Sequence, residues 1–406
     1  MVDRVRRARY AVGATFAING LTFANLVPRY PEIVAELDLD KTAFGAAVAA
    51  WPLGALLSGL LAGVAVTRWT SKRVIVVASL AMSALLVGVG WASSWLALAA
   101  VFLCVGLVDA LIDIANNAQG LWVQRRLGTS IITGLHGLWS VGAVVGGLIG
   151  SLFAGLGVPV RWHLLLTGVL FAVALLLVAR LLLPGHEPAA GPSRSHLQDE
   201  ETDGSRTDPG GRTPRVTPGV VARLLLVCLV GLAGAAGEDA GNTWGALYLT
   251  GDLQTTAAVG GAVFVAMQTA MIVGRFAGDP LVTRFGPRGV SRVGGILTVA
   301  GFGVVLATPS VVAAVIGFGV VGLGIAVLIP LAMQAADELP GLPRGFGLAV
   351  SGWMMRLGFL ATPPLIGLVA DAVGLRWAFV VPAALGVLAV AFAGLLAPAE
   401  RRPARD

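Results

Sequence analysis

Acidic and amide side chains stand inside long apolar runs of this sequence, where every charge or hydrogen-bonding group needs a partner. The run 95–123 contains Asp109, Asp113, Asn116 and Asn117. Spacings of three and four residues place these side chains on one face of a helix. Such a face cannot point at lipid, so we expect it to line a cavity. There Asp113 could exchange a proton, because desolvation favours the neutral carboxyl group. The alternative is that Asp109 and Asp113 are satisfied by a neighbouring helix.

A second pair of acids, Glu238 and Asp239, lies in the glycine-rich run 219–249, together with Asn242. Frequent glycines let a membrane helix pack closely or open around a ligand. Adjacent residues of a helix point about 100° apart, so we expect only one of the two acids to face the cavity. Glu238 is the better candidate, because it shares a face with Asn242 four residues later.

Arg356 lies in the middle of the run 345–370, where a permanently charged guanidinium needs an anionic partner. We expect it to form an ion pair with Glu238 or Asp239. If Arg356 contacted a solute instead, that solute would be anionic, since the guanidinium fork suits carboxylate and phosphate groups.

Other polar and aromatic side chains within the apolar runs are candidates for solute contact or proton relay. Hydrogen-bonded or apolar packing is the alternative for each of them. The tryptophans among them could stack on a sugar or an aromatic solute. These candidates are Asn19, Asn25, Gln119, His136, Trp139, Trp244, Gln268, Gln334 and Trp353.

The composition places these residues in a membrane protein. Of the 406 residues, 56% are hydrophobic and only 12% are charged, and the mean hydropathy is +0.85. A soluble domain of this length needs more surface charge. Runs of about 20 apolar residues can cross the hydrocarbon core as helices. We predict twelve: 10–34, 42–66, 74–92, 95–123, 131–157, 161–183, 219–249, 256–283, 289–308, 310–336, 345–370 and 375–397.

Basic residues predict the orientation of these helices. With the N-terminus inside, 22 of the 28 basic residues fall on the cytoplasmic side and four fall outside, Arg29, Lys41, Arg161 and Arg376. The remaining two, Arg275 and Arg356, lie within predicted helices. We therefore expect a multi-pass protein of the cytoplasmic (inner) membrane with both termini in the cytoplasm. Residues 184–218 are rich in proline, glycine, serine and threonine, which predicts a flexible cytoplasmic linker or, alternatively, a regulatory segment.

The chain is a tandem repeat of two halves. Asp38–Ala43 returns as Asp252–Ala257, 214 positions later, and Val66–Trp69 returns as Val282–Phe285, 216 positions later. We therefore expect two six-helix bundles, in residues 1–183 and 219–406, joined by the linker. Tandem halves in an apolar chain are typical of secondary transporters, whose solute site lies between the repeats.

The apolar runs contain no catalytic or cofactor-binding pattern. Gly317–Gly322 matches a dinucleotide fingerprint, but it lies inside an apolar run without a preceding strand, so it indicates helix packing. We find no P-loop, no metal-ligand spacing and no nucleophile–base set. The net charge of +6 is not gathered into a nucleic-acid-binding patch. We expect no enzymatic activity, cofactor, metal or nucleic-acid partner, and we interpret Cys104 and Cys228 as inert packing residues.

Six plus six helices, a long central loop and a basic hairpin in each half resemble the major facilitator superfamily over essentially the whole chain. The second half retains the superfamily's hairpin motif as Gly274-Arg275-x-x-Gly278-Asp279, and the first half has related basic residues but no aspartate. The resemblance implies an all-α membrane protein with twelve transmembrane helices in two pseudo-symmetric bundles. It also implies a cytoplasmic gating role for Arg68, Arg73, Arg275, Asp279, Arg284 and Arg288.

Residues 113–119, 136–140 and 238–249 resemble a narrower group, the YbjJ-type inner-membrane permeases near the sugar-permease branch. Asp113 followed by Asn117 is similar to the proton-coupling helix of fucose-type permeases. Those permeases also carry an aspartate near the end of the first helix, where this chain has Asn25, so a carboxylate pair is not retained. Gly146–Gly150 lacks the proline that drug antiporters usually carry in the fifth helix.

The residues and the resemblance together predict a secondary active transporter that moves a small polar solute, sugar-like or another organic metabolite, by alternating access. Proton symport through Asp113 or Glu238 is a secondary hypothesis. The alternatives are a proton-driven exporter of drugs or metabolites and a non-transporting membrane receptor of the same fold. We expect a monomer in the lipid bilayer whose partner is a small-molecule solute.

Overall fold

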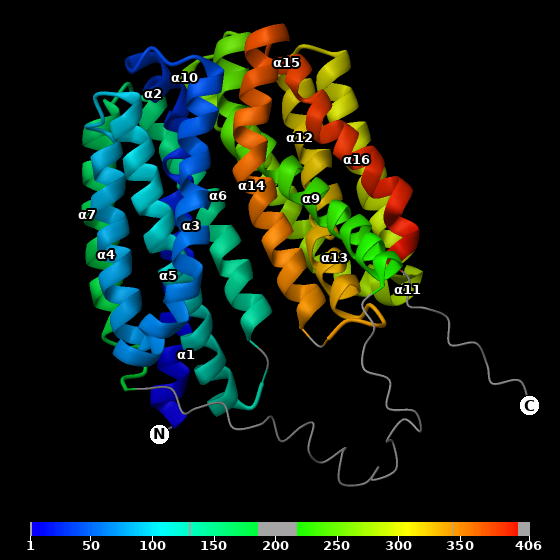
Figure 1. Cartoon of the computed structure of the whole chain (residues 1–406). Helices are drawn as coiled ribbons and strands as arrows, with labels where there is room; N and C mark the ends of the chain where they lie inside the picture. The colour runs from blue at the N-terminus through cyan, green and yellow to red at the C-terminus, as the bar shows by residue number, and fades with distance from the viewer. Residues whose placement is uncertain (1, 130, 186–216, 344, 397–406) are drawn as a thin grey trace, which may run out of the picture.

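The computed structural model describes residues 2–129, 131–185, 217–343 and 345–396, and these residues form helices joined by short turns (Figure 1). The first half contains α1 (Val2–Ala24), η1 (Val27–Arg29), α2 (Tyr30–Glu36), α3 (Lys41–Trp69), α4 (Ser71–Val89), α5 (Trp95–Leu127), α6 (Ile132–Gly155) and α7 (Val160–Ala179). The second half contains α9 (Pro218–Leu247), η2 (Tyr248–Asp252), α10 (Ala257–Gly260), α11 (Ala262–Ala307), α12 (Val311–Ile325), α13 (Leu328–Asp337), α14 (Phe346–Val373), α15 (Leu375–Ala378), α16 (Val380–Phe392) and η3 (Ala393–Leu396). Most of the predicted linker 184–218 lies outside the described residues.

Helix α11 makes two of the crossings. It contains 46 residues and would be about 69 Å long if straight, more than twice the thickness of a hydrocarbon core. Gly286 divides it, since φ 74° and ψ 159° are not helical there, and 262–285 and 287–307 form separate crossings. The described residues contain eleven segments that are apolar and long enough to cross a membrane, and this division makes twelve, as predicted.

Backbone conformation confirms the internal repeat and corrects its register at one turn. Thr70, between α3 and α4, has φ 77° and ψ 143°, close to the values of Gly286, which lies 216 positions later. Asp38 and Gln254, also 216 positions apart, both have a positive φ, 49° and 53°. The offset of 214 from matching letters is therefore wrong at this turn, because the two Asp-Leu pairs occupy different positions in it.

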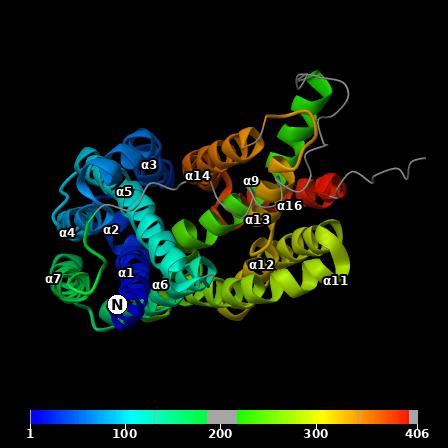
Figure 2. The same ribbon diagram turned by 90° about the horizontal axis from the view of Figure 1, so that it is seen from below.

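The helices form two bundles, α1–α7 and α9–α16, which appear side by side in Figure 2. Corresponding pairs pack in the same way in both bundles: α1 lies on α6 as α9 lies on α14. Between the bundles, the main contacts join α3 to α14 and α6 to α11. The space between the two bundles is therefore bounded by these four helices.

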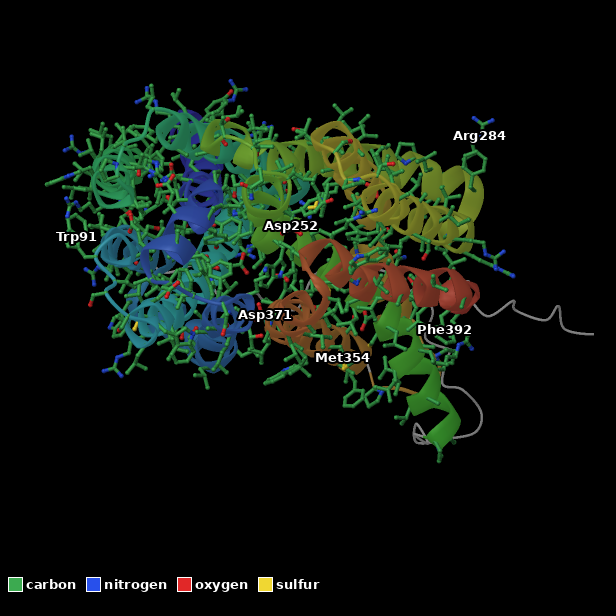
Figure 3. The ribbon with its side chains drawn as sticks, turned by 90° about the horizontal axis from the view of Figure 1, so that it is seen from above. Trp91, Asp252, Arg284, Met354, Asp371 and Phe392 are labelled. Atoms are coloured by element: carbon green, nitrogen blue, oxygen red, sulfur yellow. The ribbon has the colours of Figure 1, made fainter. Side chains whose placement is uncertain are left out.

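Helices α3 and α14 of the two bundles touch at one end of the molecule, which we call the closed end. There the carboxylate of Asp371, near the end of α14, accepts three hydrogen bonds from the start of α3. The donors are Lys41 N at 3.1 Å, Thr42 N at 2.7 Å and Thr42 Oγ1 at 2.6 Å. Figure 3, viewed onto this end, shows Asp371 at the boundary between the bundles. An acid from one bundle thus caps the N-terminus of a helix in the other.

Two glycines and two aromatic rings complete the closed end. A Cβ on Gly45 of α3 would lie 2.4 Å from Pro363 O of α14, so only glycine permits this approach. Gly367 makes a similar contact from the opposite helix. Phe44 of α3 packs edge-on against Trp244 of α9, with ring centroids 5.7 Å apart.

Away from the closed end, α3 and α14 separate. A side-chain carbon added at Gly59 of α3 or Gly352 of α14 would meet no atom within 4 Å. Figure 1 shows the two helices diverging toward the end that carries the N-terminus, which we call the open end.

Candidate functional site

A cavity of about 460 Å³ lies between the two bundles, and both bundles contribute to its wall. Asp113, His136, Arg275 and Arg356 are solvent exposed within it, so the cavity is accessible from outside the protein. The polar and charged lining residues are Asn19, Tyr30, Asp109, Asp113, Asn116, His136, Glu238, Asp239, Asn242, Thr243, Arg275 and Arg356. The aromatic ones are Phe16, Phe23, Trp51, Trp139 and Phe359, in addition to Tyr30.

Asp109 is held in the first bundle by two side-chain donors. Asn19 Nδ2 donates to its Oδ1 at 3.4 Å, and Trp51 Nε1 donates to its Oδ2 at 3.2 Å. Trp139 Nε1 in turn donates to Asn19 Oδ1 at 2.7 Å. These four residues come from α1, α3, α5 and α6, so one hydrogen-bonded chain joins four helices of the bundle. Both carboxylate oxygens of Asp109 are occupied by protein groups.

Asp113 belongs to a second hydrogen-bonded chain, one turn further along α5. Its Oδ1 accepts from Asn117 Nδ2 at 2.9 Å, and Asn117 Oδ1 lies 3.2 Å from His136 Nε2 of α6. Arg356 of α14 interacts electrostatically with Asp113 across the cavity. Asp109, Asp113 and Asn116 of the predicted polar face therefore line the cavity, whereas Asn117 lies outside the wall and contacts it through Asp113 and His136. The proton-exchange role of Asp113 stays a prediction.

Both acids of α9 line the cavity, so the expectation that only one would face it was wrong. The cavity extends around more of the α9 surface than the 100° that separates neighbouring side chains. Glu238 is 9% exposed and Asp239 is 6% exposed. Thr243 Oγ1 donates to Asp239 Oδ1 at 2.9 Å, and Gln268 Nε2 of α11 donates to Asn242 Oδ1 at 3.2 Å.

Arg275 and Arg356 both line the cavity, and neither has the environment expected from the sequence. Arg275, expected in a gating loop, lies 11 residues before the turn at Gly286, about 16 Å along the helix. It therefore lines the cavity, where it donates to Ser140 Oγ of α6 at 3.2 Å and interacts electrostatically with Glu238.

We expected Arg356 to form an ion pair with Glu238 or Asp239. Among the described residues, no nitrogen of Arg356 lies within 4 Å of a carboxylate oxygen of either acid. Arg356 lines the cavity, and its charge acts on Asp113 instead. Arg275 and Arg356 therefore interact with different acids, Glu238 and Asp113.

Two predicted site residues are turned away from the cavity and join helices of the first bundle. Asn25 Nδ2 donates to Thr167 Oγ1 at 2.9 Å, and its Oδ1 lies 2.8 Å from His163 Nε2 of α7. Gln119 accepts from Ser71 Oγ of α4 and donates to Leu183 O, both at 3.0 Å. Neither side chain lines the cavity, because neighbouring helices already use their polar atoms.

Gln119→Leu is expected to lower the stability of the protein and to leave solute binding in the cavity unchanged. The substitution leaves Ser71 Oγ and Leu183 O without their partner, and a buried unpaired polar group costs about 1–3 kcal/mol. Thermal unfolding of the purified protein should show a lower Tm. An unchanged Tm combined with lost solute binding would show that Gln119 contributes to the solute site instead.

The remaining predicted residues outside the cavity wall have other environments. Trp244 is fully buried against Phe44 at the closed end. Gln268 is fully buried and contacts the cavity residues Asn242 and Glu238 from behind the wall. Gln334 lies exposed on α13, where it donates to Glu338 Oε1 at 2.9 Å. Trp353 is 47% exposed on α14, outside the wall.

Apart from Trp139, the aromatic residues of the wall were not predicted from the sequence. Phe23 of α1 stacks on Trp139, with centroids 6.2 Å apart, and meets Trp51 edge-on at 5.4 Å. Tyr30 and Phe359 extend this surface. An aromatic residue in an apolar run is equally typical of lipid contact and of core packing, so the sequence carries no signal that would have separated these residues.

The charged hairpin residues lie at the turns of α3–α4 and α11, away from the cavity wall. Arg68, Arg73, Asp279, Arg284 and Arg288 are all exposed. Within the described residues, the Asp279 carboxylate has no ionic partner within 4 Å. The gating role of these residues stays a prediction.

Comparisons with known proteins agree with this architecture. The family model for the Major Facilitator Superfamily matches residues 12–237 and again 225–406. The uncharacterized transporter y4wD of Sinorhizobium fredii is 28% identical over 388 residues, which cover 95% of this chain and 97% of that protein.

Two solved structures show a similar fold. The nucleoside transporter NupG has a TM-score of 0.73 at 14% identity, with 96% of this chain and 98% of that chain covered. A bacterial homologue of the lysosomal transporter Spinster, in an inward-facing and unoccupied conformation, has a TM-score of 0.70 at 15% identity, with 97% of each chain covered.

Proposed function

The chain belongs to the major facilitator superfamily, and on this premise we propose that it is a secondary active transporter that moves a small polar solute by alternating access. The position of the cavity supports the proposal. Both repeats contribute to its wall, and contacts between the bundles close it at one end only. A rocking motion that separates α3 from α14 would present the same wall to the other side of the membrane.

We further propose that the protein lies in a bacterial inner membrane with both termini on the cytoplasmic side. The distribution of basic residues supports this orientation. The open end carries the N-terminus (Figure 1), so the structure is then inward-facing. A fluorescent protein fused to the C-terminus should fluoresce, and alkaline phosphatase fused at the same place should be inactive.

Uptake by proteoliposomes tests the transport function directly. Vesicles that contain the purified protein are incubated with a defined mixture of sugars, amino sugars, amines and organic acids, and their contents are measured by mass spectrometry. We expect one chemical class to accumulate above protein-free vesicles. A compound that stabilises the protein but never enters the vesicles would favour a receptor over a transporter.

Proton coupling is proposed as a property of this transport, with Asp113 and Glu238 as candidate carriers. Asp113 is exposed to the cavity and its Oδ2 has no hydrogen bond among the described residues. We expect an inwardly directed proton gradient to raise the initial rate of uptake and Asp113→Asn to abolish that increase. Uptake that ignores the gradient in both proteins would overturn the coupling without affecting the transport proposal.

A further inference from the structure

The charged groups of the cavity wall do not balance. Among the described residues the wall carries four carboxyl groups, from Asp109, Asp113, Glu238 and Asp239, and two guanidinium groups, from Arg275 and Arg356. Each arginine interacts with one acid, Arg275 with Glu238 and Arg356 with Asp113. Asp109 has a hydrogen-bond donor on each carboxylate oxygen. Three of the four acids therefore have either an arginine that acts on them or a donor on each carboxylate oxygen.

Asp239 is the exception. Its side chain is only 6% exposed, and Thr243 Oγ1 donates to Oδ1. Its Oδ2 is buried and has no hydrogen-bond partner among the described residues. Among the described residues, the charge that acts on Asp239 comes from Glu238, which is also an acid. Tyr30 of α2, another residue of the wall, interacts with Asp239 but is uncharged. A buried carboxylate with a free oxygen and no cation is unfavourable, so a donor that enters the cavity would complete the site.

We propose that the transported solute carries a protonated amine and that this ammonium group binds the carboxylate of Asp239. The inference rests on the proposed function, because it takes the central cavity as the solute site. An ammonium group supplies both the hydrogen-bond donor and the positive charge that Asp239 lacks.

The first bundle supplies a surface for the rest of the solute. Phe23, Trp51 and Trp139 form a connected aromatic cluster in the cavity wall. Aromatic faces pack against carbon skeletons and attract cations. The cavity of about 460 Å³ is large enough for a solute of the size of an amino sugar or an aromatic amine.

The same charges disfavour other occupants. An anion would compete with Glu238 for Arg275 or with Asp113 for Arg356, and it would leave Asp239 unpaired. A multivalent metal ion needs several ligands. Among the described residues, His, Cys, Asp and Glu form no group of three that could hold one.

Matched probe molecules test the inference on the full-length protein. Thermal unfolding is measured with D-glucosamine, D-glucose and D-glucuronate, and with tyramine, its alcohol analogue and 4-hydroxyphenylacetate, within a wider panel of primary amines built in the same way. We expect amines to raise the Tm, because a ligand that binds only the folded state stabilises it. The alcohol and carboxylate of the same skeleton should raise it less.

Variants of Asp239 then locate the contact. Asp239→Asn should weaken binding of the stabilising amine by about tenfold or more, equivalent to about 1.4 kcal/mol. Asp239→Glu should restore part of the affinity, which a purely structural role of Asp239 would not explain. Asp337→Asn, an aspartate of α13 outside the cavity wall, is the matched control and should bind like the wild type.

Three results would overturn the inference. They are a preference for the neutral or anionic member of the matched sets, an unchanged amine affinity in Asp239→Asn, and no stabilisation by any amine. In the first case, uptake of the preferred probe into proteoliposomes would still support the transport function. The failure of the amine proposal is then distinguishable from the failure of the transport proposal. If a proton alone neutralises Asp239, amine binding survives in Asp239→Asn, which is the second of these results.

Discussion

Gly367→Val is expected to reduce solute uptake to about a fifth of the wild-type rate or less while the protein remains folded. The Cβ alone would lie 2.3 Å from Lys41 O and 2.8 Å from the Lys41 carbonyl carbon. These are backbone atoms, which cannot rotate aside. The two helices must separate, and overpacking of this kind costs about 1–3 kcal/mol. The closed arrangement then loses population by about 5- to 150-fold, and the transport cycle needs it.

A reactive cysteine in the cavity shows whether the closed end has opened. Ala55 lines the cavity, so Ala55→Cys is introduced after Cys104 and Cys228 are replaced by alanine. A membrane-impermeant thiol reagent applied from the closed side should react faster in Gly367→Val. Gly352→Val is the matched control, because it places the same side chain on the same helix in open space. Normal uptake by Gly367→Val would show that this contact does not limit the cycle.

Asp371→Ala is expected to weaken the closed end without blocking it. The substitution removes three hydrogen bonds between the bundles and the negative charge at the start of α3. Capping and helix-dipole interactions at an exposed helix end are worth about 1 kcal/mol, so the open population at this end should rise by about fivefold. The reaction of Ala55→Cys with reagent from the closed side should accelerate by the same factor. Gly367→Val and Asp371→Ala therefore act on the same equilibrium with different strengths.

Asp252→Ala is the matched control for this prediction. Asp252 Oδ2 accepts a hydrogen bond from Arg376 N at 3.3 Å, so it also meets the start of a short helix, α15. Both residues belong to the second bundle, and the contact does not cross between bundles. We expect no change in cysteine reactivity. Equal acceleration in both variants would mean that Asp371 acts by general destabilisation rather than on the contact between the bundles.

Features that depend on local spacing were predictable from the sequence. The polar face of α5 was found because spacings of three and four residues define a helix face wherever the helix lies. The two crossings within α11 were found for a similar reason, since apolar length alone limits how far a helix can continue in a membrane.

Features that depend on which helix faces which were not predictable. Asn25, Gln119 and Trp244 have the same polar or aromatic character as Asn19 and Trp139, yet the first three are used in packing and the other two line the cavity. A polar residue inside a membrane needs a hydrogen-bonding or ionic partner, but its type does not show which residue that partner is. Helix rotation and inter-helix contact decide between these outcomes.

The sequence by itself determined the class of this protein: a membrane chain of two repeated halves with twelve apolar helices and acids in its interior. Burial of apolar length in lipid is a local requirement, so it can be read residue by residue. Only the tertiary structure decided that Arg275 interacts with Glu238, that Arg356 interacts with Asp113 and that Asp239 has neither a cation nor a donor on Oδ2 among the described residues. Charge pairing depends on distances between helices far apart in the chain, and packing of the two bundles sets those distances.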